Sequence, residues 1–263
     1  MNLGISGRVA VVTGGSEGIG KASATILAEE GANVVILART QSKLDAAVAE
    51  ISSTAVGSIE AVSCDVSDQA SVESAFGKVL ERHGNVDLLV NNAGHGNANT
   101  FDALDQEMLD EDLHLKVHGA MYCSKQVLPG MRANRWGRIV NTTTAAGKAA
   151  GYSTLPTAMS RAAGIAMTKS MSKEYGVDGI LVNTVCIGSI RSAQNMHHAE
   201  AAVASGEVAA TEEYYTKRCE NVPVRRIGEA REAGDLIAFL ASERASYISG
   251  TAVNMDGGAA PVV

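Results

Sequence analysis

The alternation of short β-branched runs with longer amphipathic segments constrains the fold of this chain most strongly. A strand that leads through a helix to the next strand is the unit of a parallel sheet, and repeating that unit covers both faces of the sheet with helices. The sequence therefore predicts an α/β fold built on a doubly wound, seven-stranded parallel sheet. The expected strands are 8–14, 33–38, 58–65, 86–94, 137–144, 180–188 and 250–258, and the expected helices are 18–30, 41–52, 68–83, 105–132, 156–175 and 229–241.

The domain organisation is expected to be simple. No linker rich in Pro, Gly or Ser divides the sequence, so we expect one domain over residues 1–263. The chain is 46% hydrophobic and 19% charged, a balance that suits a single large core. Residues 189–228 depart from the β–α rhythm, which predicts a helical insertion there.

Charge and cysteine usage argue against several functional classes. The net charge is −7, from 22 Lys and Arg against 29 Asp and Glu, so neither nucleic acid nor an anionic membrane is an expected partner. No run approaches the roughly 20 apolar residues of a membrane span and no signal peptide is visible, so we expect a cytoplasmic protein. The four cysteines are far apart, and the neighbouring His197 and His198 would point in different directions on a helix, so no metal site is expected.

The turn after the first expected strand is rich in glycine and leads directly into a helix. Glycine allows the backbone to turn sharply and approach a pyrophosphate, while the free N–H groups of the helix stabilise the anion. This context predicts a dinucleotide-binding turn in the segment Thr13-Gly14-Gly15-Ser16-Glu17-Gly18-Ile19-Gly20. The candidate cofactor-binding residues here are Gly14, Ser16, Gly18, Ile19 and Gly20.

The end of the second strand indicates which dinucleotide is bound. It carries Arg39 and no carboxylate, and a guanidinium suits a 2′-phosphate, whereas an acidic residue would hold a ribose 2′-hydroxyl. We therefore expect NADP(H) in preference to NAD(H). The alternative is a solvated surface arginine, which Glu17 favours because its charge would repel the phosphate. Asp65, followed by Val66, is placed to meet the adenine edge, although an aspartate that only forms a turn fits the spacing nearly as well.

Five motifs in order resemble the short-chain dehydrogenase/reductase family, and the resemblance covers essentially the whole chain. It implies a Rossmann fold, a nicotinamide cofactor and a homotetramer or homodimer. It also implies cofactor contacts from Asn91, Ala93, Gly94, Gly188, Ser192 and the backbone of Ile190, with residues 193–222 as a mobile lid that selects a small-molecule substrate. The motifs are Thr13-Gly14-x-x-x-Gly18-Ile19-Gly20, Cys64-Asp65-Val66, Asn91-Asn92-Ala93-Gly94, Gly137-Arg138-Ile139-Val140-Asn141 and Asp256-Gly257-Gly258.

The catalytic positions of that family are altered in this chain. Where the family carries a Ser, an Asn and a Tyr-x-x-x-Lys pair, this sequence has Thr144, Lys116, and Thr157 with Arg161. None of the six tyrosines is followed by Lys four residues later. An aliphatic hydroxyl is a poor acid at neutral pH, so Thr157 is expected only to orient groups. Arg161 can still hold ribose hydroxyls, but a guanidinium stays protonated and cannot relay a proton.

The resemblance implies that the family's tyrosine phenol donates a proton to the carbonyl oxygen of the substrate. Three residues of this chain are candidates to replace that proton donor. Lys116 can titrate when desolvated or polarise a carbonyl, Tyr152 lies between Thr144 and Thr157, and His95 has a suitable pKa. Each also has a plain structural explanation: a helix-capping lysine, a packing tyrosine or a polar loop histidine. The sequence favours an NADP(H)-dependent oxidoreductase that interconverts a ketone and a secondary alcohol with an atypical active site. The alternative is a cofactor-binding protein without redox turnover, a regulator or a lyase or cyclase, in which Lys116 and Arg161 hold an anionic substrate.

Overall fold

The central sheet has the predicted architecture. The computed structural model describes residues 2–263. Its sheet contains seven parallel strands in the order β11-β8-β6-β4-β1-β2-β3. The strands are β1 (Val9–Thr13), β2 (Asn33–Ala38), β3 (Ile59–Ser63), β4 (Leu88–Asn91), β6 (Gly137–Thr144), β8 (Ile180–Ile187) and β11 (Ala252–Met255). The doubly wound α/β fold expected from the alternating pattern is confirmed.

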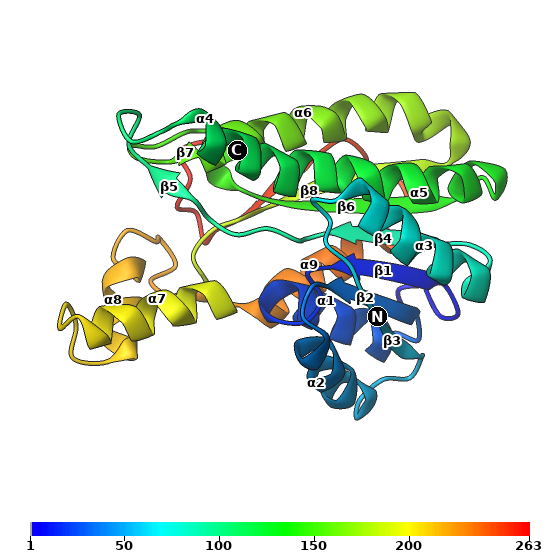
Figure 1. Ribbon diagram of the computed structural model, residues 1–263, viewed down its shortest axis with the longest axis horizontal. Coiled ribbons are helices and arrows are strands. Elements are labelled where there is room, and N and C mark those ends of the chain that lie inside the picture. The colour runs from blue at the N-terminus through cyan, green and yellow to red at the C-terminus, as the bar shows by residue number, and fades with distance from the viewer. Residues whose placement is uncertain (1) are drawn as a thin grey trace.

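Helices cover both faces of this sheet, and the side chains of each strand alternate between two cores (Figure 1). In β1, Ala10 and Val12 pack with α1 (Gly18–Glu29), α2 (Gln41–Ser52) and α9 (Ala230–Leu240). Val9 and Val11 of the same strand pack on the other face with α3 (Gln69–His83) and α5 (Gly119–Ala133). This alternation follows from the two-residue repeat of a strand. Both faces are therefore apolar, as a buried parallel sheet requires.

One expected helix is divided into three parts. The sequence pattern predicts one continuous helix over residues 105–132. The structure instead has α4 (Gln106–Leu113), a π-helical turn η1 (His114–His118) and then α5. A single π turn does not disturb the apolar periodicity enough to be read from sequence, and such turns are frequent at functional sites. The π turn carries Lys116. None of the described helices is long and apolar enough to cross a membrane.

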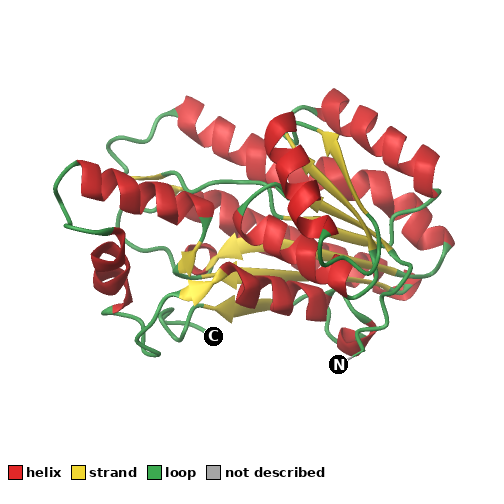
Figure 2. Cartoon of the chain, turned by 90° about the horizontal axis from the view of Figure 1, so that it is seen from below, coloured by secondary structure: helices red, strands yellow, loops and turns green. Residues whose placement is uncertain are grey.

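Two short strand pairs bring loops to the carboxyl edge of the sheet. This is the edge toward which the arrowheads of the strands point in Figure 2. The pair β5 (Ala98–Asn99) and β7 (Leu155–Pro156) is antiparallel and sets the loop after β4 against the start of α6 (Thr157–Tyr175). The pair β9 (Ile190–Arg191) and β10 (Gly228–Glu229) closes the base of the 189–228 segment. That segment contains α7 (Ala193–Ala204) and α8 (Thr211–Cys219), which extend from one end of the molecule (Figure 1). Its role as a substrate lid stays a prediction.

Candidate active site

The glycine turn has the geometry of an anion cradle. Gly14 and Gly18 have φ values of +63° and +55°, a region that disfavours other residues. A Cβ on Gly20 would lie 2.1 Å from the carbonyl oxygen of Gly14, so only glycine fits there. Helix α1 begins at Gly18, and its first N–H groups therefore face the turn. The residues present fit a pyrophosphate.

Asn92, which follows β4, holds this turn in place. Its Nδ2 donates hydrogen bonds to the carbonyl oxygens of Thr13 and Gly14, both at 3.2 Å. The Thr13 hydroxyl accepts hydrogen bonds from the backbone N–H groups of Asn92 and Ala93, both at 3.0 Å. Sequence reasoning did not single out Asn92. The available signal was the second of two asparagines directly after a buried strand, beside the glycine turn in the expected strand order.

A second helix N-terminus faces the turn from the 189–228 segment. A Cβ on Gly18 would lie 3.4 Å from the backbone nitrogen of Ala193, the first residue of α7. Ser192 caps this helix and accepts a hydrogen bond from the N–H of Asn195. The Gln194 side chain accepts a hydrogen bond from the Gly96 N–H at 3.1 Å. The cleft is thus bounded by two helix N-termini, an arrangement that suits a pyrophosphate.

Arg39 and Glu17 lie at the far end of this cleft. Arg39 is exposed, and its guanidinium forms no ion pair within residues 2–263. Glu17 is paired with Lys43 at 2.8 Å, so its charge is largely compensated. The repulsion that argued for a merely solvated Arg39 is therefore weaker than the sequence suggested, and the end of the cleft fits a 2′-phosphate.

The other predicted cofactor residues are distributed between the cleft and the interior. Asp65 lines the cleft beside Val66, and its carboxylate accepts hydrogen bonds from the N–H and hydroxyl of Ser67, the geometry of a turn-forming aspartate. Asn91 is buried and donates to Asn141 at 2.8 Å, so its side chain serves the interior. The predicted residues that line the cleft are Gly14, Ser16, Gly18, Ile19, Arg39, Asp65, Val66, Ala93 and Gly94.

Gly188 and Ile190 lie below the cleft. A Cβ on Gly188 would come within 2.5 Å of the Asp256 Cβ, so this glycine permits a close approach of two loops. The Ile190 side chain is buried in the core, and its carbonyl oxygen accepts hydrogen bonds from Ser192 and Asn195. The expected backbone contact of Ile190 with a carboxamide remains a prediction.

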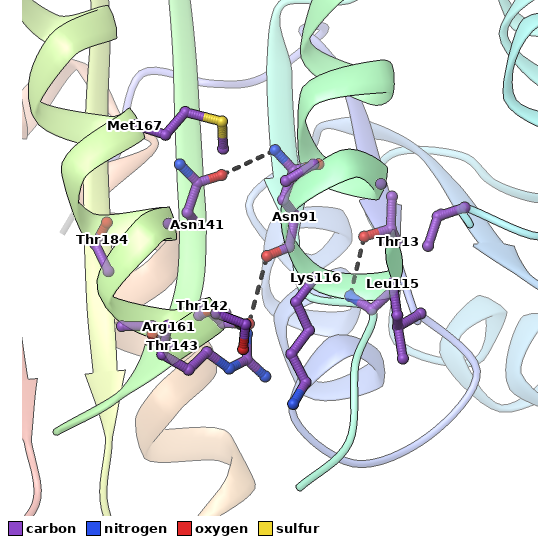
Figure 3. A pocket seen from close by; sticks show the side chains of 16 residues that line it. Thr13, Asn91, Leu115, Lys116, Asn141, Thr142, Thr143, Arg161, Met167 and Thr184 are labelled. Carbon is purple, nitrogen blue, oxygen red and sulfur yellow. Dashed lines mark hydrogen bonds between the residues drawn. The ribbon is translucent and has the colours of Figure 1, made fainter. Parts of the chain in front are cut away.

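The structure brings Lys116, Thr157 and Arg161 together beside a small cavity that shares lining residues with the cleft. Lys116 Nζ donates to Thr157 Oγ1 at 3.1 Å, and Arg161 donates to the carbonyl oxygen of Thr142 at 2.9 Å. Figure 3 shows the Lys116 and Arg161 side chains extending toward one another across a cavity. The hydroxyl of Thr144, the predicted oxyanion residue, is buried and without a hydrogen-bond partner in the described chain.

The Thr157 hydroxyl is fully occupied. It accepts from the Asn97 N–H at 2.9 Å and from Lys116, and it donates to the Asn97 carbonyl oxygen at 2.7 Å. A hydroxyl has one proton and two lone pairs, so no capacity remains for a substrate. Thr157 therefore orients its neighbours, as expected.

Lys116 is buried in an ion pair with Asp112, one turn earlier in α4. Each of the two side chains is 1% exposed. The Asp112 carboxylate also accepts a hydrogen bond from Ser160 at 2.5 Å. Burial lowers the pKa of Lys116 to about 8, and the Arg161 charge acts in the same direction, against the opposing effect of Asp112. Lys116 thus contacts side chains and does not serve as a cap of helix carbonyls.

The remaining candidates for the proton donor differ in placement. Tyr152 is 91% exposed and lies outside the cavity that contains Lys116. His95 lines the dinucleotide cleft, where burial, followed by the charge of Lys116, lowers its pKa. No group of three His, Cys, Asp or Glu side chains within residues 2–263 has the arrangement of a metal site.

Comparisons with known proteins agree with this geometry. The family described as enoyl-(acyl carrier protein) reductase matches residues 14–260. Oxidoreductase UcpA of Salmonella typhimurium is 34% identical over 255 residues, 97% of this chain and 95% of that protein. The 3-oxoacyl-(acyl-carrier-protein) reductase FabG of Vibrio cholerae is 33% identical over 256 residues, 97% of this chain and 98% of that protein. The structure of L-sorbose reductase from Gluconobacter frateurii, complexed with NADPH and L-sorbose, is similar with a TM-score of 0.95 at 30% identity, covering 100% of both chains.

Proposed function

Since the chain belongs to the short-chain dehydrogenase/reductase family of oxidoreductases, we propose that it uses NADP(H) to interconvert a ketone and a secondary alcohol in an atypical active site. One observation carries the proposal: the dinucleotide cleft is complete, although the residues beside it are altered. Two helix N-termini face a glycine turn that Asn92 holds, and Arg39 is free at the far end.

The preference for NADP(H) rests on Arg39. A guanidinium makes strong charge-assisted hydrogen bonds to phosphate. No ion pair within residues 2–263 holds the Arg39 guanidinium, although its charge also acts on the Asp65 carboxylate in the same cleft. L-sorbose reductase and the reductase YwfH, 30% identical to this chain with a TM-score of 0.90, are described as NADPH proteins. These relatives support the same cofactor for this chain.

Different residues of the chain would bind different groups of the cofactor. The glycine turn and the N-terminus of α7 would hold the pyrophosphate, Arg39 the 2′-phosphate, and Arg161 the ribose of the nicotinamide. A bound NADPH would supply a hydride to the carbonyl carbon of the substrate. We further propose a cytoplasmic homotetramer or homodimer that acts on a small-molecule carbonyl or alcohol.

The cofactor preference is tested by Arg39→Glu. We expect this variant to raise the Kd for NADPH at least tenfold, about 1.4 kcal/mol, because it replaces an attraction to the 2′-phosphate with a repulsion. The Kd for NADH should stay within about threefold of the wild-type value, because the ribose 2′-hydroxyl of NADH can donate a hydrogen bond to the new carboxylate. Lys125→Glu, on the exposed surface of α5, makes the same change in net charge away from the cleft. Cofactor fluorescence titrations measure all four affinities, and equal loss in both variants would contradict the role of Arg39.

A cofactor-binding protein without redox turnover is the second candidate, favoured by the fully occupied Thr157 hydroxyl. The two functions are separated by mixing the wild-type protein with NADPH and a broad panel of ketones. Loss of absorbance at 340 nm supports the oxidoreductase. Tight NADPH binding with no absorbance change for any ketone supports the second candidate.

A further inference from the structure

We propose that Lys116 is the catalytic residue that transfers the proton to the substrate oxygen, and that Asp112, Ser160 and Thr157 are the positioning residues that hold its ammonium in place. This inference rests on the proposed oxidoreductase function. It replaces the family's phenol with an amine that comes from a different helix and is held by a buried network.

The Lys116 ammonium has one hydrogen-bond donor without a partner in the described chain. Lys116 Nζ has three N–H donors, of which one reaches Asp112 and one reaches Thr157. The third has no acceptor within residues 2–263. Lys116 lines a cavity of about 20 Å³ together with Arg161 and Thr142 (Figure 3). This volume admits a single oxygen atom, so the third donor would meet the carbonyl oxygen of a substrate only where that oxygen enters the cavity.

A buried hydrogen-bond network fixes the position of the Lys116 ammonium. The Asp112 carboxylate accepts hydrogen bonds from Lys116 and from Ser160. Ser160 lies one turn along α6 from Thr157. The Thr157 hydroxyl is in turn fixed by the backbone of Asn97, through the pairing of β5 with β7. The ammonium is therefore held from two helices and one loop. Such fixed geometry is what proton transfer in a transition state requires.

The charges around Lys116 suit reversible proton transfer. The charged or titratable groups that face Lys116 are Asp112 from α4, Arg161 from α6 and His95 from the loop after β4. Arg161 is close, since a Cβ on Gly94 would lie 3.1 Å from its Nη2 and 3.4 Å from Lys116 Cγ. Burial together with this second cation lowers the pKa of Lys116 to about 8, close to the working pH of a proton donor.

The step balances in atoms and charge. As the hydride forms the new C–H bond, the electrons of the C=O double bond move to oxygen. The oxygen takes a proton from Nζ, so one N–H bond breaks and one O–H bond forms. The neutral amine then regains its proton from the buffered solvent, so one solvent proton is consumed for each ketone reduced. In alcohol oxidation the neutral amine accepts the hydroxyl proton.

The test compares Lys116→Met with the control Lys125→Met, which removes an exposed lysine from the following helix. We expect Lys116→Met to lower kcat for ketone reduction by about 100-fold or more, the contribution typical of general acid catalysis, while the Kd for NADPH changes less than about threefold. The control should change neither value. Activity of Lys116→Met within about threefold of wild type would overturn the inference.

A second readout needs no activity. Nuclear magnetic resonance of side-chain-labelled lysine in the cofactor-free protein should show one lysine titrating well below the others, absent in Lys116→Met and shifted in Thr157→Val. An unshifted resonance in Thr157→Val would overturn its positioning role. A wild-type protein that binds NADPH yet reduces no ketone would instead overturn the proposed function and this inference with it, whereas an active Lys116→Met would overturn the inference alone.

Discussion

Position 157 shows how one substitution changes the chemistry around it. The Thr157 hydroxyl is too weakly acidic to donate a proton at neutral pH, and it is occupied by Asn97 and Lys116. The same hydroxyl helps to hold a buried ammonium whose only described carboxylate partner is Asp112. Thr157 and Lys116 therefore belong to one hydrogen-bonded network, in which Lys116 is the group with the lowered pKa.

The buried lysine makes the stability of the protein depend on pH. Lysine has an ordinary pKa of 10.5, and in the folded protein Lys116 has a pKa of about 8. Between these values the unfolded chain binds the additional proton, so the contribution of Lys116 to the free energy of unfolding rises as pH increases from about 8 to 10.5. The buried thiols of Cys64, Cys123 and Cys186, whose pKa values burial raises, contribute with the opposite sign. Below pH 8 the ammonium costs the folded state a few kcal/mol, at about 1.4 kcal/mol per pKa unit.

We predict that this rise disappears in the double variant Lys116→Met/Asp112→Asn, in which neither side chain titrates. Urea denaturation of both proteins between pH 7 and 10.5 measures the difference in unfolding free energy. Parallel curves over that interval would show that Lys116 titrates at its ordinary pKa in the folded protein.

At the scale of elements, the ends of β1, β4 and β6 and the starts of α1 and α6 meet at one edge of the sheet. The π turn η1 adds Lys116 to this edge from the helix that follows β4. Strand ends bring rigid backbone to the site, whereas the 189–228 segment contributes only the N-terminus of α7. The cofactor cradle therefore depends on contacts between elements, of which those of Asn92 are the most direct.

Removal of the Asn92 side chain should loosen the contact between β4 and the glycine turn. We expect Asn92→Ala to weaken NADPH binding by up to about 30-fold, because two hydrogen bonds to the turn are lost at about 1 kcal/mol each. Asn134→Ala, at the exposed end of α5, serves as a matched control. Isothermal titration calorimetry measures both affinities, and an unchanged Kd in Asn92→Ala would mean that the turn is rigid without this clamp.

At the scale of the whole molecule, the sequence predicted the sheet and its helices because each depends on local periodicity. The strand runs at β1 and β2 and the glycine turn between them needed no tertiary information. The pairings of β5 with β7 and of β9 with β10 were not predicted, because two-residue strands form only when the fold brings distant loops together.

The candidate site was predicted in part for the same reason. Lys116, Thr157 and Arg161 were identified through their motif positions, and the structure places them together. Asp112 was missed, although an acidic residue four positions before a lysine was visible in the sequence. Ser160 and Asn97 reach the network only through the packing of α4, α6 and the loop after β4, which no local pattern encodes.

The most direct test of the account is a crystal structure of the protein with NADP⁺ and an alcohol product bound. We predict that Arg161 contacts the nicotinamide ribose and that Lys116 Nζ lies about 3 Å from the alcohol oxygen, within reach for proton transfer. A nicotinamide ring excluded from the cavity, or an alcohol oxygen bound by no titratable group, would contradict both the proposed reaction and the role of Lys116.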